Sequence, residues 1–214
     1  YYAEDTLSYF DVLASLSLKG FPVVSLDKKE FELDFPTILS DNLAGGFSAT
    51  QFLIQQKHSR IAYFYGNSLH LQSVRSRYLG YLKALEKAKL SFHSSSNQPT
   101  EITNDLIDYW LSHNVTAIIC ENDIVAIKLM KRVKEKGVKI PNDISIIGFD
   151  NIQAAHYVEP ALTTIAQNFK QIGTLSALTL LKWIQSGKKP QDSVVPVTLV
   201  QRKSTTENKN DCFN

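Results

Sequence analysis

The sequence predicts an α/β protein with parallel β-sheets, and two observations support this prediction. Short runs rich in β-branched and aromatic residues alternate along the chain with longer amphipathic segments. Most of the short runs are continuously apolar, which is typical of parallel strands that helices cover on both faces. With 214 residues, 43% hydrophobic and 21% charged, the chain is long enough to bury the core of one large or two small domains.

The predicted elements follow one another in the order that parallel βαβ units require. The strands are expected at 21–27, 37–40, 60–66, 116–120, 144–150 and 195–202. The helices are expected at 73–89, 104–113, 123–136 and 168–186. Within the helix at 123–136, apolar side chains recur at helical spacing while the lysines face outward. Gly137 marks the end of that helix.

Composition and charge exclude several classes of protein. The formal net charge is +2 and no stretch of Lys and Arg is dense enough for a phosphate-binding stripe, so we do not expect this chain itself to bind nucleic acid. Cys120 lies in an apolar strand and Cys212 in the polar tail, which argues against a disulfide framework. No apolar run approaches the roughly 18 residues of a membrane span, and no signal peptide is visible. The only methionine is Met130, so we expect the chain to be part of a longer protein.

Polar side chains recur at the carboxyl ends of the predicted strands, where ligands bind in open parallel sheets. These residues are Asp27, Asn67, Ser68, Ser73, Arg75, Arg77, Glu121, Asn122, Asp123 and Asp150. Carboxylates accept hydroxyl protons, an amide both donates and accepts, and a guanidinium donates along two edges. The set therefore suits a neutral, polyhydroxylated ligand.

Each of these side chains also has a purely structural interpretation. An Asp at a helix start, such as Asp123 or Asp41, is most often an N-cap that stabilises by about 1 kcal/mol, and a lone Arg75 or Arg77 is more often a surface residue. No Ser or Cys lies on a nucleophile elbow, and no strand-to-helix turn has a Gly-rich phosphate fingerprint. The five histidines show no metal-ligand spacing. We therefore predict neither an enzyme nor a cofactor or metal site.

Several longer stretches resemble the effector-binding (sugar-sensor) domain of the LacI/GalR family of bacterial transcriptional regulators. They are "DNLAGGFSATQFLIQQKHSRIAYFYG" followed by "RSRYLGYLKAL", "ENDIVAIKLMKRVKEKGVKIPNDISIIGFDN", "EPALTTIAQNFKQIG" and "VPVTLVQRKST". The resemblance implies a periplasmic-binding-protein-like fold, in which two Rossmann-like subdomains with parallel sheets are joined by crossing strands. The first subdomain would comprise 1–66 plus 167–190 and the second 67–166 plus 191–206, with a tail at 207–214.

The resemblance also implies a function. A small effector, expected to be a sugar, would bind between the two subdomains of a cytoplasmic homodimer. It would control operator binding through an N-terminal DNA-binding domain that is not in this chain. By motif match, its ligands would be Asp27, Ser73, Arg77, Asn122, Asp150 and Gln167. Among these, Arg77 resembles the Arg that clamps the effector, Asn122 its amide partner, and Asp150 the acid that holds effector hydroxyls.

Three departures from the family pattern leave alternatives open. Lys57 replaces the Gly that is usual before His58, where a helix end favours a left-handed residue. Lys128 stands where many members have Gly, as in arabinose-type regulators, so the DNA-binding head could be a winged helix. The family's first subdomain begins with two βα units and a further strand before the segment that matches 21–27, so on the order of 50 to 60 of its residues would be absent from this chain.

Two other functions stay in consideration. A periplasmic sugar-binding protein of an importer shares the two-lobed plan, but the ending "RKST" fits the regulators. An α/β enzyme acting on a sugar or nucleotide would need a general base close to its substrate. Asp150 could serve as that base, but nothing in the sequence supplies an electrophile or a phosphate cradle.

Overall fold

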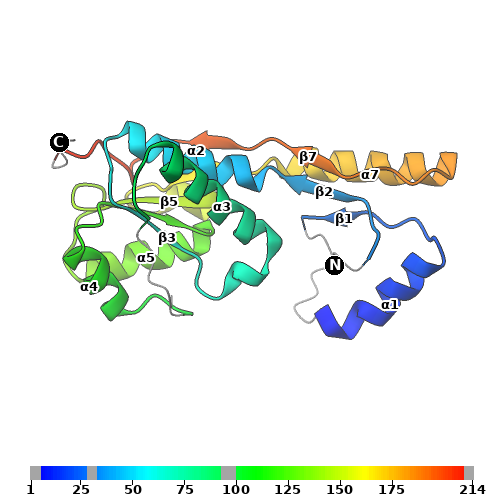
Figure 1. Cartoon of the computed structure of the whole chain (residues 1–214), viewed down its shortest axis with the longest axis horizontal. Coiled ribbons are helices and arrows are strands. Elements are labelled where there is room, and N and C mark those ends of the chain that lie inside the picture. The colour runs from blue at the N-terminus through cyan, green and yellow to red at the C-terminus, as the bar shows by residue number, and fades with distance from the viewer. Residues whose placement is uncertain (1–5, 28–32, 93–99, 210–214) are drawn as a thin grey trace. The chain divides into compact units, whose positions relative to one another are not determined.

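The computed structural model describes residues 6–27, 33–92 and 100–209 of the chain. They form two compact units, each built around its own sheet of parallel strands (Figure 1). The first unit comprises Tyr1–Ser40 and Asn168–Pro196, and the second comprises Asp41–Gln167 and Val197–Asn214. The predicted α/β class with parallel sheets is confirmed. Cys212 lies outside the described residues, as does the end of the tail predicted at 207–214.

The first unit contains a three-stranded parallel sheet in the order β1-β2-β7. Its elements are α1 (Thr6–Leu18), β1 (Ser25–Leu26), β2 (Thr37–Ser40), α7 (Phe169–Ser186) and β7 (Ser193–Val195). Helix α7 packs on the sheet through a small core of Ile38, Ile172 and Val195. These three side chains are almost fully buried, whereas much of the surface of α7 remains exposed.

The second unit contains a five-stranded sheet in the order β3-β4-β5-β6-β8, parallel except for β8, which runs antiparallel to β6. The strands are β3 (Ile61–Phe64), β4 (Ala117–Cys120), β5 (Ser145–Asp150), β6 (Thr163–Ala166) and β8 (Thr198–Val200). The helices are α2 (Asn42–Gln55), α3 (Gln72–Lys87), α4 (Asn104–Ser112), α5 (Asp123–Glu135) and the short α6 (Ala154–Tyr157), with a 3₁₀ turn at Ser68–His70. No helix in the described part of the chain combines the length and apolarity that a membrane crossing requires.

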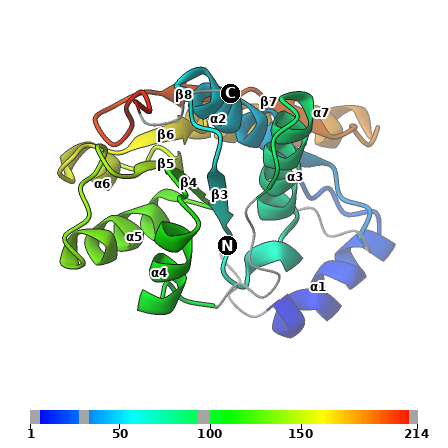
Figure 2. The same ribbon diagram turned by 60° about the vertical axis from the view of Figure 1, so that its left-hand side comes forward.

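Helices cover both faces of the five-stranded sheet, as the continuous apolar strands predicted. In β3, Ala62 and Phe64 pack against α4 and α5, whereas Ile61 and Tyr63 pack against α2 and α3. This alternation follows from the two-residue period of a strand, which sends successive side chains to opposite faces. Figure 2 shows α4 and α5 on one side of these strands and α3 on the other.

Two glycines allow α2 and α3 to touch backbone to backbone. A Cβ atom on Gly46 would lie 1.9 Å from the carbonyl oxygen of Arg77, and one on Gly80 would lie 2.2 Å from that of Leu43. No other residue fits either position, because any side chain would force the helices apart. The close crossing brings Arg77 of α3 next to Asn42 at the start of α2.

The unit boundaries differ from those expected at residues 66–67 and near 191. Strand β3 pairs in register with β4, with Ile61 opposite Ala117, so residues 41–66 belong to the second unit and the chain changes unit between Ser40 and Asp41. The single strand expected at 195–202 is divided by Pro196 into β7 and β8, which belong to different sheets. A strand belongs to the sheet with which it forms hydrogen bonds, and an apolar run in the sequence does not predict these partners.

Candidate functional site

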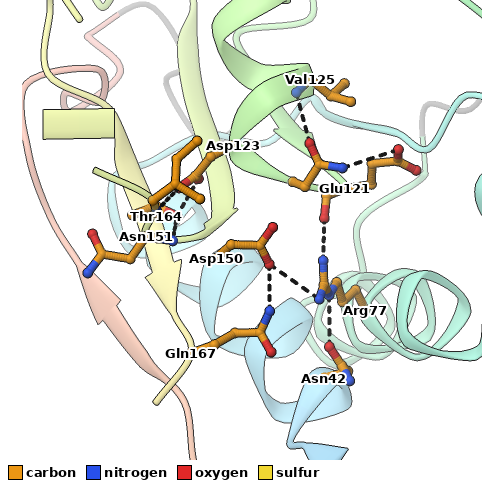
Figure 3. Close-up of polar contacts among 11 residues, drawn as sticks. Asn42, Arg77, Glu121, Asp123, Val125, Asp150, Asn151, Thr164 and Gln167 are labelled. Carbon is orange, nitrogen blue, oxygen red and sulfur yellow. Dashed lines mark hydrogen bonds and ion pairs between the residues drawn. The ribbon is translucent and has the colours of Figure 1, made fainter. Parts of the chain in front are cut away.

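Arg77 lies at the centre of a polar cluster at the carboxyl edge of the five-stranded sheet (Figure 3). The residue is only 4% exposed. Its Nε donates a hydrogen bond to Asn42 Oδ1 at 2.8 Å, and its Nη1 donates to the backbone oxygen of Glu121 at 2.6 Å. Its Nη2 lies 3.5 Å from Asp150 Oδ1. The guanidinium is therefore fixed by groups from α2, the end of β4 and the end of β5.

The planar face of the guanidinium is also occupied. Its central carbon lies 3.7 Å from the centroid of the Phe149 ring, which is a cation–π contact. Phe149 directly precedes Asp150, so β5 supplies both the ring under the guanidinium and a carboxylate beside it. A buried charge needs such partners, because burial without them would be very costly.

Asp150 ends β5 in an unusual backbone conformation. Its φ is 108° and that of Asn151 is 56°, and each such non-glycine residue costs on the order of 1–3 kcal/mol. The turn is held by two contacts: Asn151 N donates to Thr164 Oγ1 at 3.3 Å, and Arg202 Nη2 donates to Asn151 Oδ1 at 2.6 Å. The Asp150 carboxylate, about one fifth exposed, accepts a bond from Gln167 Nε2 at 2.6 Å. Strain retained beside a partly exposed carboxylate points to a functional position.

Glu121 follows β4 and is the second carboxylate next to Arg77. Its side chain is buried, and Oε1 accepts a bond from Ser68 Oγ at 3.1 Å and a long one from Asn122 Nδ2 at 3.5 Å. Burial raises the pKa of the Glu121 carboxyl above its usual value, although the Ser68 hydrogen bond and the Arg77 charge oppose this shift. Asn122 Oδ1 accepts from Val125 N at 2.9 Å and so caps α5.

Asp123 does not cap α5, although the sequence favoured that interpretation; Asn122, one residue earlier, is the N-cap. Asp123 is fully buried, and its two oxygens accept bonds from Thr164 Oγ1 at 2.5 Å and from Ile152 N at 2.8 Å. Gly148 leaves room for it, since a Cβ there would lie 2.2 Å from Asp123 Oδ1. Burial raises the pKa of Asp123 to about 6, even though both hydrogen bonds oppose the shift. Asp123 therefore ties the start of α5 to β6 and to the segment that follows Asp150.

The structure brings most of the predicted ligands together within the second unit. Arg77, Asp150 and Gln167 form one connected group, and Asn122 lies beside it with its oxygen engaged as a cap. Ser73 is half-buried on α3, one turn before Arg77, but Ser68 is the serine that bonds Glu121.

Asp27 belongs to the first unit. It follows β1 with a φ of 59°, and its backbone N–H donates to Ile38 O at 3.0 Å. Its role as a ligand stays a prediction.

The six ligands predicted by motif match did not include Asn42, Glu121 or Ser68. Glu121 and Ser68 stand at the predicted strand ends, but nothing in the sequence separated them from their neighbours. Asn42 is 35 residues from Arg77, and only the glycines of "LAGG" and "RYLG" hinted that these two helices approach closely. Among the residues that the structure describes, no group of three or more His, Cys, Asp or Glu could hold a metal ion. The donors and acceptors present suit reversible binding of hydroxyl groups.

Comparison with known proteins identifies the family. Residues 50–205 match the family of periplasmic binding protein-like domains. The HTH-type transcriptional repressor PurR of Histophilus somni is 32% identical over 209 residues, which is 94% of this chain and 62% of the repressor. The repressor CytR of Escherichia coli K12 is 33% identical over 172 residues, or 77% of this chain and 50% of the repressor. The chain thus spans only about half to two thirds of these relatives.

Solved structures show the same fold. A LacI family transcriptional regulator from Enterococcus faecium with bound ribose has a TM-score of 0.81 and 30% identity, covering 95% of this chain and 77% of that one. A periplasmic binding protein/LacI transcriptional regulator from Alkaliphilus metalliredigens, complexed with D-xylulofuranose, has a TM-score of 0.79 and 26% identity, covering 94% and 84%. The predicted resemblance is confirmed: the chain belongs to the LacI family of transcriptional regulators, as the periplasmic-binding-protein-like, effector-binding domain of that family.

Proposed function

We propose that this domain senses a small sugar and that the sugar binds at the carboxyl edge of the five-stranded sheet. The observation that supports this best is the connected group of Arg77, Asp150 and Gln167. A guanidinium, a carboxylate and an amide side by side offer both donors and acceptors to neighbouring hydroxyls of one sugar ring. The strained turn at Asp150 aims the carboxylate, and strain of this kind persists where function requires it.

The relatives support the sugar class and the regulatory role. Two solved neighbours bind ribose and D-xylulofuranose, and the curated relatives are named as HTH-type repressors. These names favour a regulator over the periplasmic transporter protein and over an enzyme. We infer that the whole protein binds operator DNA through a helix-turn-helix segment and acts in the cytoplasm as a homodimer.

The proposed control requires only differential affinity. A sugar that binds one conformation of the domain more tightly than another shifts the population toward the first. In a dimer that reads two half-sites, a small change in the spacing of the DNA-binding heads changes operator affinity. Asp27, Ser73 and Asn122 remain candidate ligands beside the central group.

A thermal-shift screen against pentoses, hexoses, disaccharides and nucleobases tests the proposal. A sugar present at 100 times its Kd should stabilise the protein by about 2.7 kcal/mol and raise the Tm accordingly. Asp150→Asn keeps a side chain that tolerates positive φ but removes the charge, so affinity should fall about 10- to 150-fold. Asp105→Asn, at an exposed position in the first turn of α4, is the matched control. If the Asp150→Asn protein responds to the sugar as strongly as the parent, the site is elsewhere.

A further inference from the structure

Glu121 holds a buried acceptor that the described residues do not satisfy. The side chain is 7% exposed, and its Oε2 is buried with no hydrogen-bond donor among residues 6–27, 33–92 and 100–209. The other oxygen, Oε1, accepts from Ser68 and Asn122. A carboxylate oxygen left without a donor is costly when buried, so this atom needs an explanation.

The nearby cation does not supply the missing donor. Arg77 donates Nε to Asn42 and Nη1 to the backbone oxygen of Glu121, while Nη2 faces Asp150. None of these contacts reaches Glu121 Oε2. Burial raises the pKa of the Glu121 carboxyl in spite of Arg77, which is consistent with a negative charge that the protein compensates incompletely.

The position of Glu121 places this acceptor at the proposed sugar site. Glu121 directly follows β4, and Asp150 is the last residue of β5. The strands β4 and β5 are neighbours in the sheet. Figure 3 shows the Arg77 guanidinium reaching the backbone oxygen of Glu121 and the carboxylate of Asp150. The two carboxylates lie close enough that, in addition to burial, the charge of Asp150 raises the pKa of the Glu121 carboxyl. Such a pair favours a ligand that donates hydrogen bonds and disfavours a ligand that adds negative charge.

We propose that Glu121 determines specificity: its Oε2 accepts a hydrogen bond from a hydroxyl of an uncharged sugar, and its charge excludes phosphorylated sugars. This inference rests on the sugar-sensing function proposed above and narrows it to a class of ligand. In the bound state the sugar hydroxyl supplies the donor that Oε2 lacks. A phosphate group at the same place would meet the carboxylates of Glu121 and Asp150, while Arg77 is already engaged by Asn42, the Glu121 backbone oxygen and Asp150.

Two variants of Glu121 separate the hydrogen bond from the charge. Isothermal titration calorimetry would measure the Kd of D-ribose and of D-ribose 5-phosphate for the parent and for each variant. Glu121→Gln keeps the shape and removes the charge, so D-ribose should bind at least 10-fold more weakly and its preference over the phosphate ester should shrink at least 10-fold. Glu121→Asp keeps the charge but shortens the reach, so D-ribose should weaken while the preference remains. Glu135→Gln, at the exposed end of α5, should change neither Kd.

The outcomes distinguish this inference from the proposed function. If the parent binds neither D-ribose nor any other sugar of the thermal-shift screen, the sugar-sensing function fails and the inference fails with it. If Asp150→Asn abolishes D-ribose binding while both Glu121 variants bind D-ribose within twofold of the parent, only the inference is overturned. A merely structural Glu121 would weaken both ligands equally in Glu121→Gln and leave the preference unchanged, which would also overturn it.

Discussion

Arg77 should contribute more to the stability of the second unit than any exposed charge. The substitution Arg77→Met keeps an unbranched side chain of similar length but removes the guanidinium. It deletes the bonds to Asn42 and to the backbone oxygen of Glu121, and it leaves the Asp150 carboxylate without its ion-pair partner. The perturbation therefore removes one partner from a buried, charged network.

The magnitude follows from the contacts. Hydrogen bonds to charged groups contribute about 1.5–3 kcal/mol each, and removal of one partner of a buried ion pair costs about 3–5 kcal/mol. A sulfur contact between Met and the Phe149 ring would return about 0.3–1.5 kcal/mol. We expect a net loss of about 3–5 kcal/mol in the free energy of unfolding. Arg77→Lys retains the charge but cannot span the same partners, and should cost about half as much.

The two tryptophans allow the second unit to be observed alone. Trp110 is buried in α4 of the second unit, 6.0 Å from the Phe64 ring, whereas Trp183 lies in α7 of the first unit. In a Trp183→Phe background, urea unfolding followed by fluorescence reports the environment of Trp110, and the linear extrapolation yields the free energy of unfolding.

A loss of less than about 1 kcal/mol for Arg77→Met would refute the reasoning, because changes of that size are typical of surface positions. The double variant Arg77→Met with Asp150→Asn gives an internal check. Removing the stranded carboxylate should restore part of the lost stability, so the two substitutions should not be additive.

Two further predictions concern the packing and the titration of this unit. Gly46→Ala should destabilise by about 1–3 kcal/mol or more, because its Cβ would lie 1.9 Å from the Arg77 carbonyl oxygen. In Gly173→Ala, in α7, the added Cβ would meet nothing within 4 Å, so this variant should be more stable by up to about 1 kcal/mol. The urea midpoint should therefore fall for Gly46→Ala and rise for Gly173→Ala, and midpoints that move in the same direction would contradict this packing. The pKa of Asp123 is raised from 3.8 to about 6, so the folded chain binds this proton more tightly than the unfolded chain does. The free energy of unfolding should therefore fall as the pH rises from about 4 to about 6, by about 1.4 kcal/mol per pH unit. Asp123→Asn should lack this loss, and parallel stability–pH profiles for the parent and the variant would exclude the shift.

The elements with a clear local pattern were predictable from the sequence. The strands β3, β4 and β5, marked by continuous apolar runs, and the helices α3, α4, α5 and α7, marked by apolar periodicity, all lie within the predicted ranges or within a residue or two of them. Local backbone signals also agreed with the structure: Asp41 caps α2 through Ala44 N, Lys57 has a φ of 63° after that helix, and Gly137 has a φ of 77° after α5. Each of these signals depends on a few neighbouring residues.

The unpredicted elements are those without a local signal. Strand β6, Thr163–Ala166, begins with two threonines, so no continuous apolar run marks it. Helix α1 was not predicted, and several of its apolar side chains, including Val12 and Leu18, are exposed, so no buried stripe marks it. Residues 195–202 look like one strand because both halves are apolar, although Pro196 separates them.

The candidate site, too, was predictable only where a local sequence signal marked its residues. Polar strand ends indicated Arg77 and Asp150, but the sequence could not tell an N-cap from the next residue, so Asp123 was assigned the role of Asn122. The contact of Arg77 with Asn42 joins residues 35 positions apart and depends on the crossing of α2 and α3. Such contacts are set by tertiary packing.

The most direct test of the central claim is a crystal structure of the protein bound to D-ribose, or to the sugar with the largest thermal shift. We expect density for the sugar at the carboxyl edge of β4 and β5, with its hydroxyls within hydrogen-bond distance of Arg77 and Asp150. A sugar bound elsewhere, with the contacts among Arg77, Asp150 and Gln167 unchanged, would contradict it.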